Sequence, residues 1–370
     1  MCANFSTEAG KIGPSSRNRR VFLTAAGVAT WAWLMVGPLG LAAEPELKAG
    51  AVFPAKDTLS IGEEKKSDAA ACLDGLKWTP QSFDVKLEKS EQRQGEWLVR
   101  FPTPFPSQDP VNDVVAMEWR IAKDANGQPI KAPAVVVVHE SGRGMVAGRF
   151  IGGGLRDKGF HTFMLHLPGY GARTSEFTKD VKKMLPALQQ AVGDVRRARD
   201  AAAALPFVDT TAISLEGTSL GGFVVATVAG LDSGYQKSFV LLAGGQLSDV
   251  LLNGKRDAAT MRKQLEGVGV TADQIKTLCA RIEPMRLAHR IDKNRLWLFS
   301  ANEDEVVPPN CTEAFAQAIG LDADHHKRLP AGHYTAAFHV PVVIQQMANV
   351  LNGRPIDDAL PAPVVLPGAK

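Results

Sequence analysis

One short stretch, Thr211–Ala226, restricts the possible folds of this 370-residue chain more than any other. Its sequence is TAISLEGTSLGGFVVA, in which an apolar run ending at Leu215 indicates a buried strand. An apolar helical pattern begins at Phe223, and between the two segments glycines stand two places before and two places after Ser219. So tight a turn admits only residues without a Cβ beside the serine, whose hydroxyl is thereby pushed out above the sheet.

Apolar runs that read as strands alternate with helical patterns along most of the chain. Ala134–Val138 is continuously apolar, which is typical of a strand buried on both faces of a parallel sheet. Further strands are expected at His161–His166, Ser238–Leu242, Arg295–Ser300 and His326–Leu329. Alternating strand patterns between Ser82 and Lys123 come first and suggest antiparallel pairing. The sequence therefore predicts an α/β fold with a mostly parallel, doubly wound sheet, antiparallel leading strands and a small helical insertion.

Three residues with complementary chemistry follow the ends of predicted strands. Ligands of doubly wound sheets bind at the carboxyl ends of the strands, where Ser219, Asp304 and His333 are all expected. Serine hydrolysis needs a base for the hydroxyl proton, a carboxylate that orients the base, and donors for the oxyanion. The chain order serine, aspartate, histidine is the order found in α/β-hydrolases. Glu303 and Glu305 flank Asp304 and are alternatives to it.

From about Val114 to Leu351 the chain resembles an α/β-hydrolase of the dienelactone hydrolase, acetyl xylan esterase and prolyl-oligopeptidase-like group. The segments that carry the resemblance are HESG, LPGYG, DVRRARDAAAALPFVD, GTSLGG, NEDEVVPP and GHY. The resemblance implies that Asp304 is the acid rather than Glu303 or Glu305, because Val-Val-Pro follows it after one residue. It also implies that His333, which follows a glycine, is the base. No metal or organic cofactor is implied.

The resemblance also implies an oxyanion hole made of two backbone N–H groups. One belongs to Leu220, the residue after the nucleophile, and the other to Ser141, the residue after His-Glu. Many esterases have glycines at this second position, so Glu140 and Ser141 depart from their pattern. Dienelactone hydrolases share the glutamate but use a cysteine nucleophile, so their lactone substrate is not carried over. Glu140 is expected either to contact the Ser219 hydroxyl or to form a salt bridge with Arg143.

Several residues beside the proposed catalytic groups are candidates for the substrate pocket. They are His139, Glu140, Gly142 and Tyr334. Substrate choice is expected to lie with segments 141–156 and 245–292. The first of these contains three arginines, Arg143, Arg149 and Arg156, which either bind an anionic acid or sugar or are solvated.

The amino terminus resembles a twin-arginine export signal. Arg19-Arg20 precede Phe22-Leu23, and an uncharged, small-residue run continues to Ala43, where Leu-Ala-Ala suits a cleavage site. The alternative is a retained membrane anchor, since the run is long enough to span a bilayer. Gly37-Pro38 would break such a helix and favours cleavage. The expected location is therefore periplasmic or secreted, without stable membrane association after cleavage.

The charge balance of the rest of the chain argues against nucleic-acid binding. The first 43 residues hold four of the 42 basic residues and one of the 39 acidic residues, so 38 of each remain. A body with no net charge offers little attraction to a phosphate backbone.

The predicted organisation has one catalytic domain and no second one. Residues 1–43 are the signal peptide, 44–80 an irregular lead-in, 81–353 the hydrolase domain, and 354–370 a proline-rich tail. Within the domain, residues 245–292 are expected to form a helical, cap-like insertion.

Cysteines and histidines outside the proposed triad suggest little further chemistry. After signal removal three cysteines remain, and an oxidising compartment permits a Cys279–Cys311 disulfide, although buried thiols are an equally good interpretation. The neighbouring residues His325 and His326 point to opposite faces of a strand, so no metal site is expected there.

These observations predict an exported serine hydrolase that cleaves carboxylic esters through a Ser-His-Asp triad and an acyl-enzyme. The expected partner is a small-molecule or carbohydrate ester, and the oligomeric state is left open. The alternatives are a peptidase of the prolyl-oligopeptidase-like type and a non-catalytic, hydrolase-like binding protein.

Overall fold

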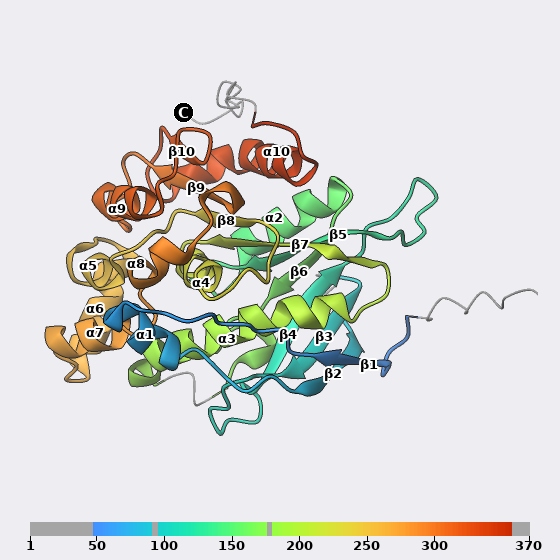
Figure 1. The fold of residues 1–370 in the computed structure, drawn as a ribbon, viewed down its shortest axis with the longest axis horizontal. Coiled ribbons are helices and arrows are strands. Elements are labelled where there is room, and N and C mark those ends of the chain that lie inside the picture. Colours follow the sequence, from blue (N-terminus) through green and yellow to red (C-terminus); the bar gives the residue numbers. More distant parts are fainter. Residues whose placement is uncertain (1–46, 91–94, 176–179, 357–370) are drawn as a thin grey trace, which may run out of the picture. The chain divides into compact units, whose positions relative to one another are not determined.

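A ten-stranded sheet organises the described part of the chain (Figure 1). The computed structural model describes residues 47–90, 95–175 and 180–356. The strand order is β1-β2-β3-β4-β6-β5-β7-β8-β9-β10. Neighbouring strands are antiparallel from β1 to β4 and between β4 and β6, and parallel from β6 through to β10. The strands are β1 Val52–Lys56, β2 Ser82–Lys89, β3 Trp97–Pro102, β4 Val114–Arg120, β5 Ala132–Val138, β6 His161–Leu165, β7 Val208–Thr218, β8 Ser238–Leu241, β9 Leu296–Ala301 and β10 His326–Leu329.

Helices cover both faces of this sheet. The α-helices are α1 Ser67–Asp74, α2 Val146–Asp157, α3 Met184–Ala203, α4 Leu220–Ala229, α5 Leu247–Asn253, α6 Asp257–Gly267, α7 Ala272–Cys279, α8 Pro284–Leu287, α9 Pro309–Ile319 and α10 Val340–Leu351. Short 3-10 helices are η1 Gly171–Arg173, η3 Val181–Lys183, η4 Ala288–Arg290, η5 Lys293–Arg295 and η6 Thr335–His339. Buried side chains of α2 and α10 pack on one face of the sheet, and those of α3, α4 and α9 belong to the core on the other.

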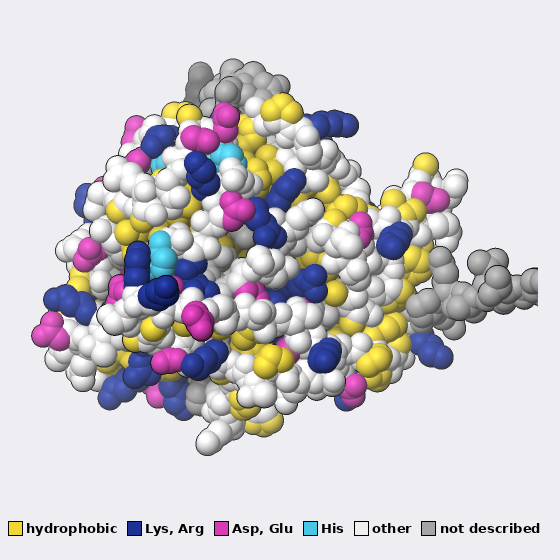
Figure 2. Space-filling model, in the orientation of Figure 1, with side chains coloured by type: hydrophobic (Ala, Val, Ile, Leu, Met, Phe, Trp, Pro, Cys, Tyr) yellow, Lys and Arg dark blue, Asp and Glu magenta, His cyan; other side chains and the backbone are white. Residues whose placement is uncertain are grey.

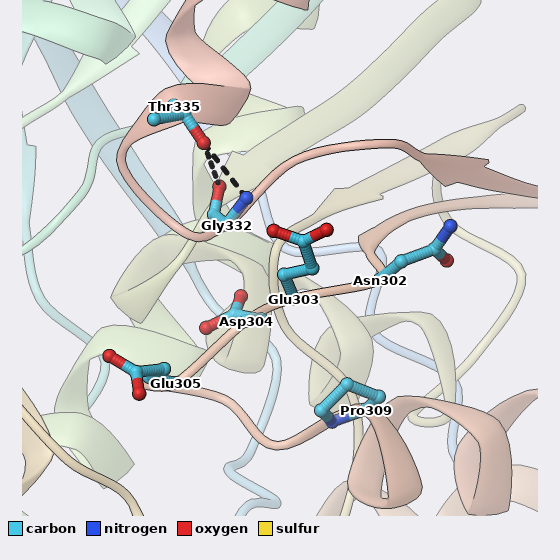
Figure 3. Close-up of a pocket in the computed structure, with 7 residues that line it drawn as sticks. All are labelled: Asn302, Glu303, Asp304, Glu305, Pro309, Gly332 and Thr335. Atoms are coloured by element: carbon cyan, nitrogen blue, oxygen red, sulfur yellow. Dashed lines mark hydrogen bonds between the residues drawn. The ribbon is translucent and has the colours of Figure 1, made fainter.

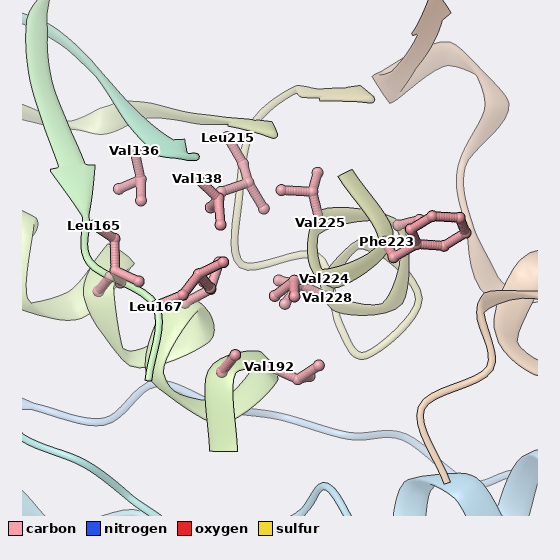
Figure 4. Packing of buried hydrophobic residues seen from close by; sticks show 14 of the residues in the cluster. Val136, Val138, Leu165, Leu167, Val192, Leu215, Phe223, Val224, Val225 and Val228 are labelled. Atoms are coloured by element: carbon pink, nitrogen blue, oxygen red, sulfur yellow. The ribbon is translucent and has the colours of Figure 1, made fainter. Parts of the chain in front are cut away.

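The continuous apolar run of β5 lies at the centre of both cores. Val136 and Val138 belong to the core that includes α3 and α4, and Figure 4 shows them facing residues of α4 such as Val225. Val135 and Val137 belong to the opposite core, under α2 and α10. Because successive side chains of a strand point to opposite faces, burial on both sides requires apolar residues at every position. The predicted fold class, with its antiparallel leading strands, is confirmed.

The prediction of an irregular lead-in at 44–80 is wrong for two parts of that segment. Val52–Lys56 forms β1, an antiparallel edge strand on β2, and Ser67–Asp74 forms α1. The strand is short and contains Pro54, which an edge strand accommodates because one side of its backbone makes no ladder bonds. Neither element is long enough for a clear periodic signal. Residue 81 is therefore not the start of the sheet.

The segment that precedes β2 is attached to helix α3 through a buried ion pair and hydrogen bonds. Arg197 donates to Asp57 through Nε at 2.9 Å and Nη2 at 2.6 Å, and both side chains are fully buried. The Thr58 backbone N–H and hydroxyl donate to the two carboxylate oxygens of Asp200 at 2.8 and 2.6 Å. A buried ion pair that loses one partner is strongly destabilising, so these residues must assemble with α3 for the fold to be complete.

Other expectations for the body of the chain have mixed outcomes. Segment 245–292 is helical, as α5 to α8. Cys72, Cys279 and Cys311 are buried free thiols, so the Cys279–Cys311 disulfide is not formed and the buried-thiol alternative holds. Burial raises the pKa of the Cys279 thiol to about 12. No helix in the described ranges is long and apolar enough to cross a membrane. The signal peptide and most of the proline-rich tail lie outside the described residues.

Candidate active site

Ser219 occupies the strained turn between β7 and α4. Its backbone has φ 53° and ψ −114°, a conformation that non-glycine residues rarely adopt and that is found mainly where function requires it. Close packing around the turn explains its flanking glycines. A Cβ at Gly217 would lie 2.4 Å from the Gly221 carbonyl oxygen, and one at Gly221 would lie 2.2 Å from the Val138 carbonyl oxygen. Strand β5 thus approaches the elbow so closely that only glycine fits.

The structure brings Ser219, His333 and Asp304 into one chain of hydrogen bonds. Ser219 Oγ lies 3.0 Å from His333 Nε2, and His333 Nδ1 lies 2.7 Å from Asp304 Oδ2. The second oxygen of Asp304 accepts the backbone N–H groups of Val306 and Val307, both at 2.8 Å. The histidine and aspartate side chains are largely buried, so water has little access to the hydrogen bond by which this carboxylate orients the imidazole.

The two glutamates beside Asp304 have other surroundings. Glu305 is exposed and pairs with Lys255 at 2.7 Å and with Arg256 at 3.6 Å, and the hydrogen bond and charge of Lys255 hold the pKa of Glu305 below its ordinary value. Glu303 lines an open hollow of about 560 Å³ along the acid and base loops. Figure 3 shows its carboxylate directed toward Gly332, away from Asp304. Among the three, Asp304 is the residue that bonds to His333.

The hollow in Figure 3 does not contain Ser219. Its lining consists of Asn302, Glu303, Asp304, Glu305, Pro309, Gly332 and Thr335. Ser219 and the loop after β5 take no part in that lining. The hollow therefore borders Asp304 and the loop that carries His333, and it does not reach Ser219.

His139 holds the loop after β5 in place through hydrogen bonds to backbone groups. His139 Nε2 accepts the Leu167 backbone N–H at 3.1 Å, so Nδ1 carries the proton and donates to the Glu140 carbonyl oxygen at 2.5 Å. Burial lowers the pKa of His139 to about 3, which keeps the ring neutral at ordinary pH. His139 was expected to line the pocket. Its side chain is instead fully buried under the loop, because both ring nitrogens are used by backbone groups.

Tyr170 fixes the next peptide of the same loop. Its ring packs on His139 with a centroid separation of 4.7 Å, and its hydroxyl donates to the Ser141 carbonyl oxygen at 3.0 Å. Burial raises the pKa of Tyr170, so the hydroxyl remains a donor. Because a trans peptide holds N–H opposite C=O, the bonds to the Glu140 and Ser141 carbonyls also set the directions of the Ser141 and Gly142 N–H groups.

Leu220 and Tyr334 lie on the other segments of the site. Leu220 is the first residue of α4, where a backbone N–H has no acceptor within the helix and is available to an anion. Tyr334 is half exposed, and its ring meets His333 edge to face at 5.5 Å. Gly142 is exposed in the loop after β5.

Glu140 makes neither of the two contacts expected of it in the described part of the structure. Its Oε2 accepts the backbone N–H of Gly148 in the first turn of α2, at 3.2 Å. This bond joins the loop to the helix that follows. The expectation failed because sequence spacing does not show which backbone donors a side chain meets.

The three arginines of segment 141–156 were expected either to bind an anion or to be solvated, and two of them form ion pairs. Arg149 Nη2 lies 2.8 Å from Glu118 Oε1, and its Nη1 donates to the Gly144 carbonyl at 2.7 Å. Burial opposes ionisation of Glu118, but hydrogen bonds from His166 and Arg149 outweigh it and keep the pKa of Glu118 below its ordinary value. Arg156 pairs with Asp157 at 3.2 Å. Arg143 is exposed.

A buried carboxyl group beneath the elbow was not anticipated. Glu216 is fully buried, and burial, reinforced by the charge of Glu140, raises its pKa to about 8 even though Thr218 Oγ1 donates to it at 2.8 Å. The sequence signal was present, as a lone acidic residue within an apolar strand.

The mixed sheet, the elbow after β7 and the serine–histidine–aspartate chain define an α/β-hydrolase. The model of the prolyl oligopeptidase family matches residues 154–336. No curated protein sequence matches the chain. The fold and the family match together place this chain in the α/β-hydrolase group of serine hydrolases.

Solved structures agree with the fold at low sequence identity. Acetyl xylan esterase 1 from a Thermoanaerobacterium species has a TM-score of 0.52 and 17% identity, over 76% of this chain and 92% of that one. The acetyl xylan esterase from a Paenibacillus species has a TM-score of 0.52 and 15% identity, over 80% and 96%. A putative dipeptidyl aminopeptidase IV from Bacteroides ovatus has a TM-score of 0.50 and 12% identity, over 74% of this chain and 41% of that one.

Proposed function

We propose that this protein is an exported serine hydrolase that cleaves carboxylic esters through an acyl-enzyme on Ser219. The observation that carries the proposal is the hydrogen-bonded chain from Ser219 Oγ through His333 to Asp304. His333 takes the serine proton as Oγ attacks the carbonyl carbon, and then delivers it to the departing alcohol. In the second half of the reaction His333 takes a proton from the water that attacks the acyl-enzyme, and then returns a proton to Ser219 Oγ.

Backbone donors are proposed to stabilise the tetrahedral oxyanion. The N–H of Leu220 lies at the start of α4, next to the nucleophile, and the N–H of Ser141 is oriented by the bond from His139 to the Glu140 carbonyl. Donors fixed before the reaction stabilise developing charge without having to reorganise.

Two comparisons support an ester over a peptide as substrate. The two acetyl xylan esterases are covered over nearly their whole length, whereas less than half of the putative dipeptidyl aminopeptidase is covered. Peptide cleavage is the second candidate, because the family model that matches is that of prolyl oligopeptidases.

Pre-steady-state hydrolysis of p-nitrophenyl acetate tests the proposal. We expect release of p-nitrophenolate that depends on Ser219, with a burst of nearly one equivalent where deacylation is the slower step. No hydrolysis by the wild type, or the same rate in Ser219→Ala, would overturn it. A proline p-nitroanilide hydrolysed faster than the ester would favour the peptidase. Export is tested separately, by sequencing the amino terminus of periplasmic protein, which should begin at Glu44.

Tyr170→Phe is expected to lower kcat for ester hydrolysis by roughly tenfold, the effect of losing about one hydrogen bond. The variant frees the Ser141 carbonyl and loosens the proposed oxyanion loop, while the ring still packs on His139. KM should change little, because the loss falls on the transition state. Steady-state kinetics and a melting curve check this. An equal rise in KM with unchanged kcat would show that Tyr170 serves binding instead.

A further inference from the structure

The four most exposed large hydrophobic side chains in the described ranges lie on α2 and on the segment that follows His333. Val146 is 70% exposed, Phe338 62%, Phe150 54% and Tyr334 52%. The remaining large hydrophobic residues at the surface are each less than half exposed, and they are Val52, Val111, Val268 and Ile130. Single exposed apolar residues are ordinary, but a group of them next to a site marks a binding surface.

The four residues form two pairs on two segments of the site. Val146 and Phe150 are one turn apart on α2, the helix that follows the proposed oxyanion loop, so they share one face. Tyr334 directly follows His333, and Phe338 lies four residues further on, in η6.

Packing between α2 and α10 places Phe150 and Phe338 toward the same side of the sheet. A Cβ at Gly154 of α2 would lie 2.7 Å from Ile344 Cδ1 of α10, so the helices are in contact. Both helices begin at the carboxyl edge of the sheet, the edge that carries the triad. Phe150 precedes Gly154 by one turn and Phe338 precedes Ile344 by six residues, so both phenylalanines lie toward that edge.

On the face in Figure 2, lysines and arginines are intermixed with acidic side chains, and apolar side chains are also present. Segment 245–292 places charged groups next to Tyr334. Asp257 of α6 hydrogen-bonds to the Tyr334 side chain, and Arg256 lies nearby. The most exposed large apolar side chains in the described ranges are therefore those of α2 and of the segment from Tyr334 through η6.

We propose that Val146, Phe150, Tyr334 and Phe338 form an apolar rim that binds an aromatic ring carried by the ester substrate. The inference rests on the proposed ester hydrolysis. A substrate is the occupant that the positions favour, because Tyr334 touches the proposed base and α2 continues the proposed oxyanion loop. Covering such side chains with a ring removes apolar area from water and adds aromatic contacts.

Hydrolysis of three esters tests the rim, namely ethyl acetate, 2-phenylethyl acetate and ethyl 3-phenylpropanoate. Their ester groups have similar reactivity, and a phenyl ring is added on the alcohol or the acyl side. We expect kcat/KM for at least one phenyl ester to exceed that for ethyl acetate by about tenfold. In the double variant Phe150→Ser, Phe338→Ser this ratio should fall toward one. The matched control, Val52→Ser with Val111→Ser, removes exposed apolar side chains elsewhere and should keep the ratio.

The outcomes separate the rim from the proposed function. No Ser219-dependent hydrolysis of any of the three esters would overturn both. Ser219-dependent hydrolysis with the same ratio in the double variant would overturn the rim alone. Sedimentation that shows a dimer for the wild type and a monomer for the double variant would also overturn it, since a second copy would then cover these residues. A melting curve shows that both double variants are folded.

Discussion

Ser219→Ala is expected to reduce kcat for ester hydrolysis by about 10⁵- to 10⁶-fold, the loss that follows removal of a serine nucleophile. The variant removes the attacking oxygen but leaves His333 bonded to Asp304. The variant should still hydrolyse the ester faster than water alone does, because the backbone donors can still bind the oxyanion that forms when water attacks the ester directly. Initial rates with p-nitrophenyl acetate measure both proteins.

The control for this variant is Ser233→Ala. Ser233 is exposed and lies beyond the carboxyl end of α4. Its backbone carbonyl accepts a hydrogen bond from Arg295, and the substitution keeps this carbonyl. Its rate should equal that of the wild type. A Ser219→Ala rate within tenfold of the wild-type rate would assign the nucleophile elsewhere.

Asp304→Asn should lower kcat by about 10⁴-fold with little change in KM, by analogy with the loss measured when a triad aspartate becomes asparagine. An amide at this position can donate to His333 Nδ1 and so leave the proton on Nε2. In that tautomer the ring no longer accepts the proton of Ser219. The two oxygens of Asp304 are bonded to His333 and to the Val306 and Val307 N–H groups, so an asparagine of nearly the same shape should occupy the same position.

Glu303→Gln and Glu305→Gln are matched controls for Asp304→Asn. They make the same chemical change at the adjacent positions, where the side chains line the hollow or pair with Lys255. Each should keep kcat within a few-fold of the wild type. A 10⁴-fold loss in either control, with Asp304→Asn active, would move the acid to that glutamate.

The fold class was readable from the sequence because its strongest signals are local. The run Ala134–Val138 is buried on both faces, and the glycines around Ser219 meet backbone atoms that exclude a Cβ. The strand patterns placed Ser219, Asp304 and His333 just after strand ends, and these strands are β7, β9 and β10. The prolyl oligopeptidase match and the sheet confirm the fold and the α/β-hydrolase group, while the roles of the three residues stay a prediction.

What the sequence did not show depends on contacts between distant residues. Tyr170 was part of the quoted LPGYG segment, but its bond to Ser141 joins residues that the chain separates by 29 positions. Arg149 was expected either to bind an anion or to be solvated, and it is held by Glu118 from β4. β1 was missed because its pattern makes sense only once β2 is beside it and Asp57 has met Arg197.

The acid and base loops are also joined to each other by backbone bonds. The Asn302 N–H donates to the Leu329 carbonyl, and the Glu303 N–H to the Ala331 carbonyl, both at 3.0 Å. Asp304 and His333 should consequently move as one rigid body, with their mutual distance insensitive to thermal motion. Ser219 is held against β5 by its flanking glycines, and its backbone N–H donates to the Leu241 carbonyl of β8 at 2.8 Å. The distance between Ser219 Oγ and His333 Nε2 should therefore vary more than that between His333 and Asp304, and in the proposed reaction the first proton crosses this distance.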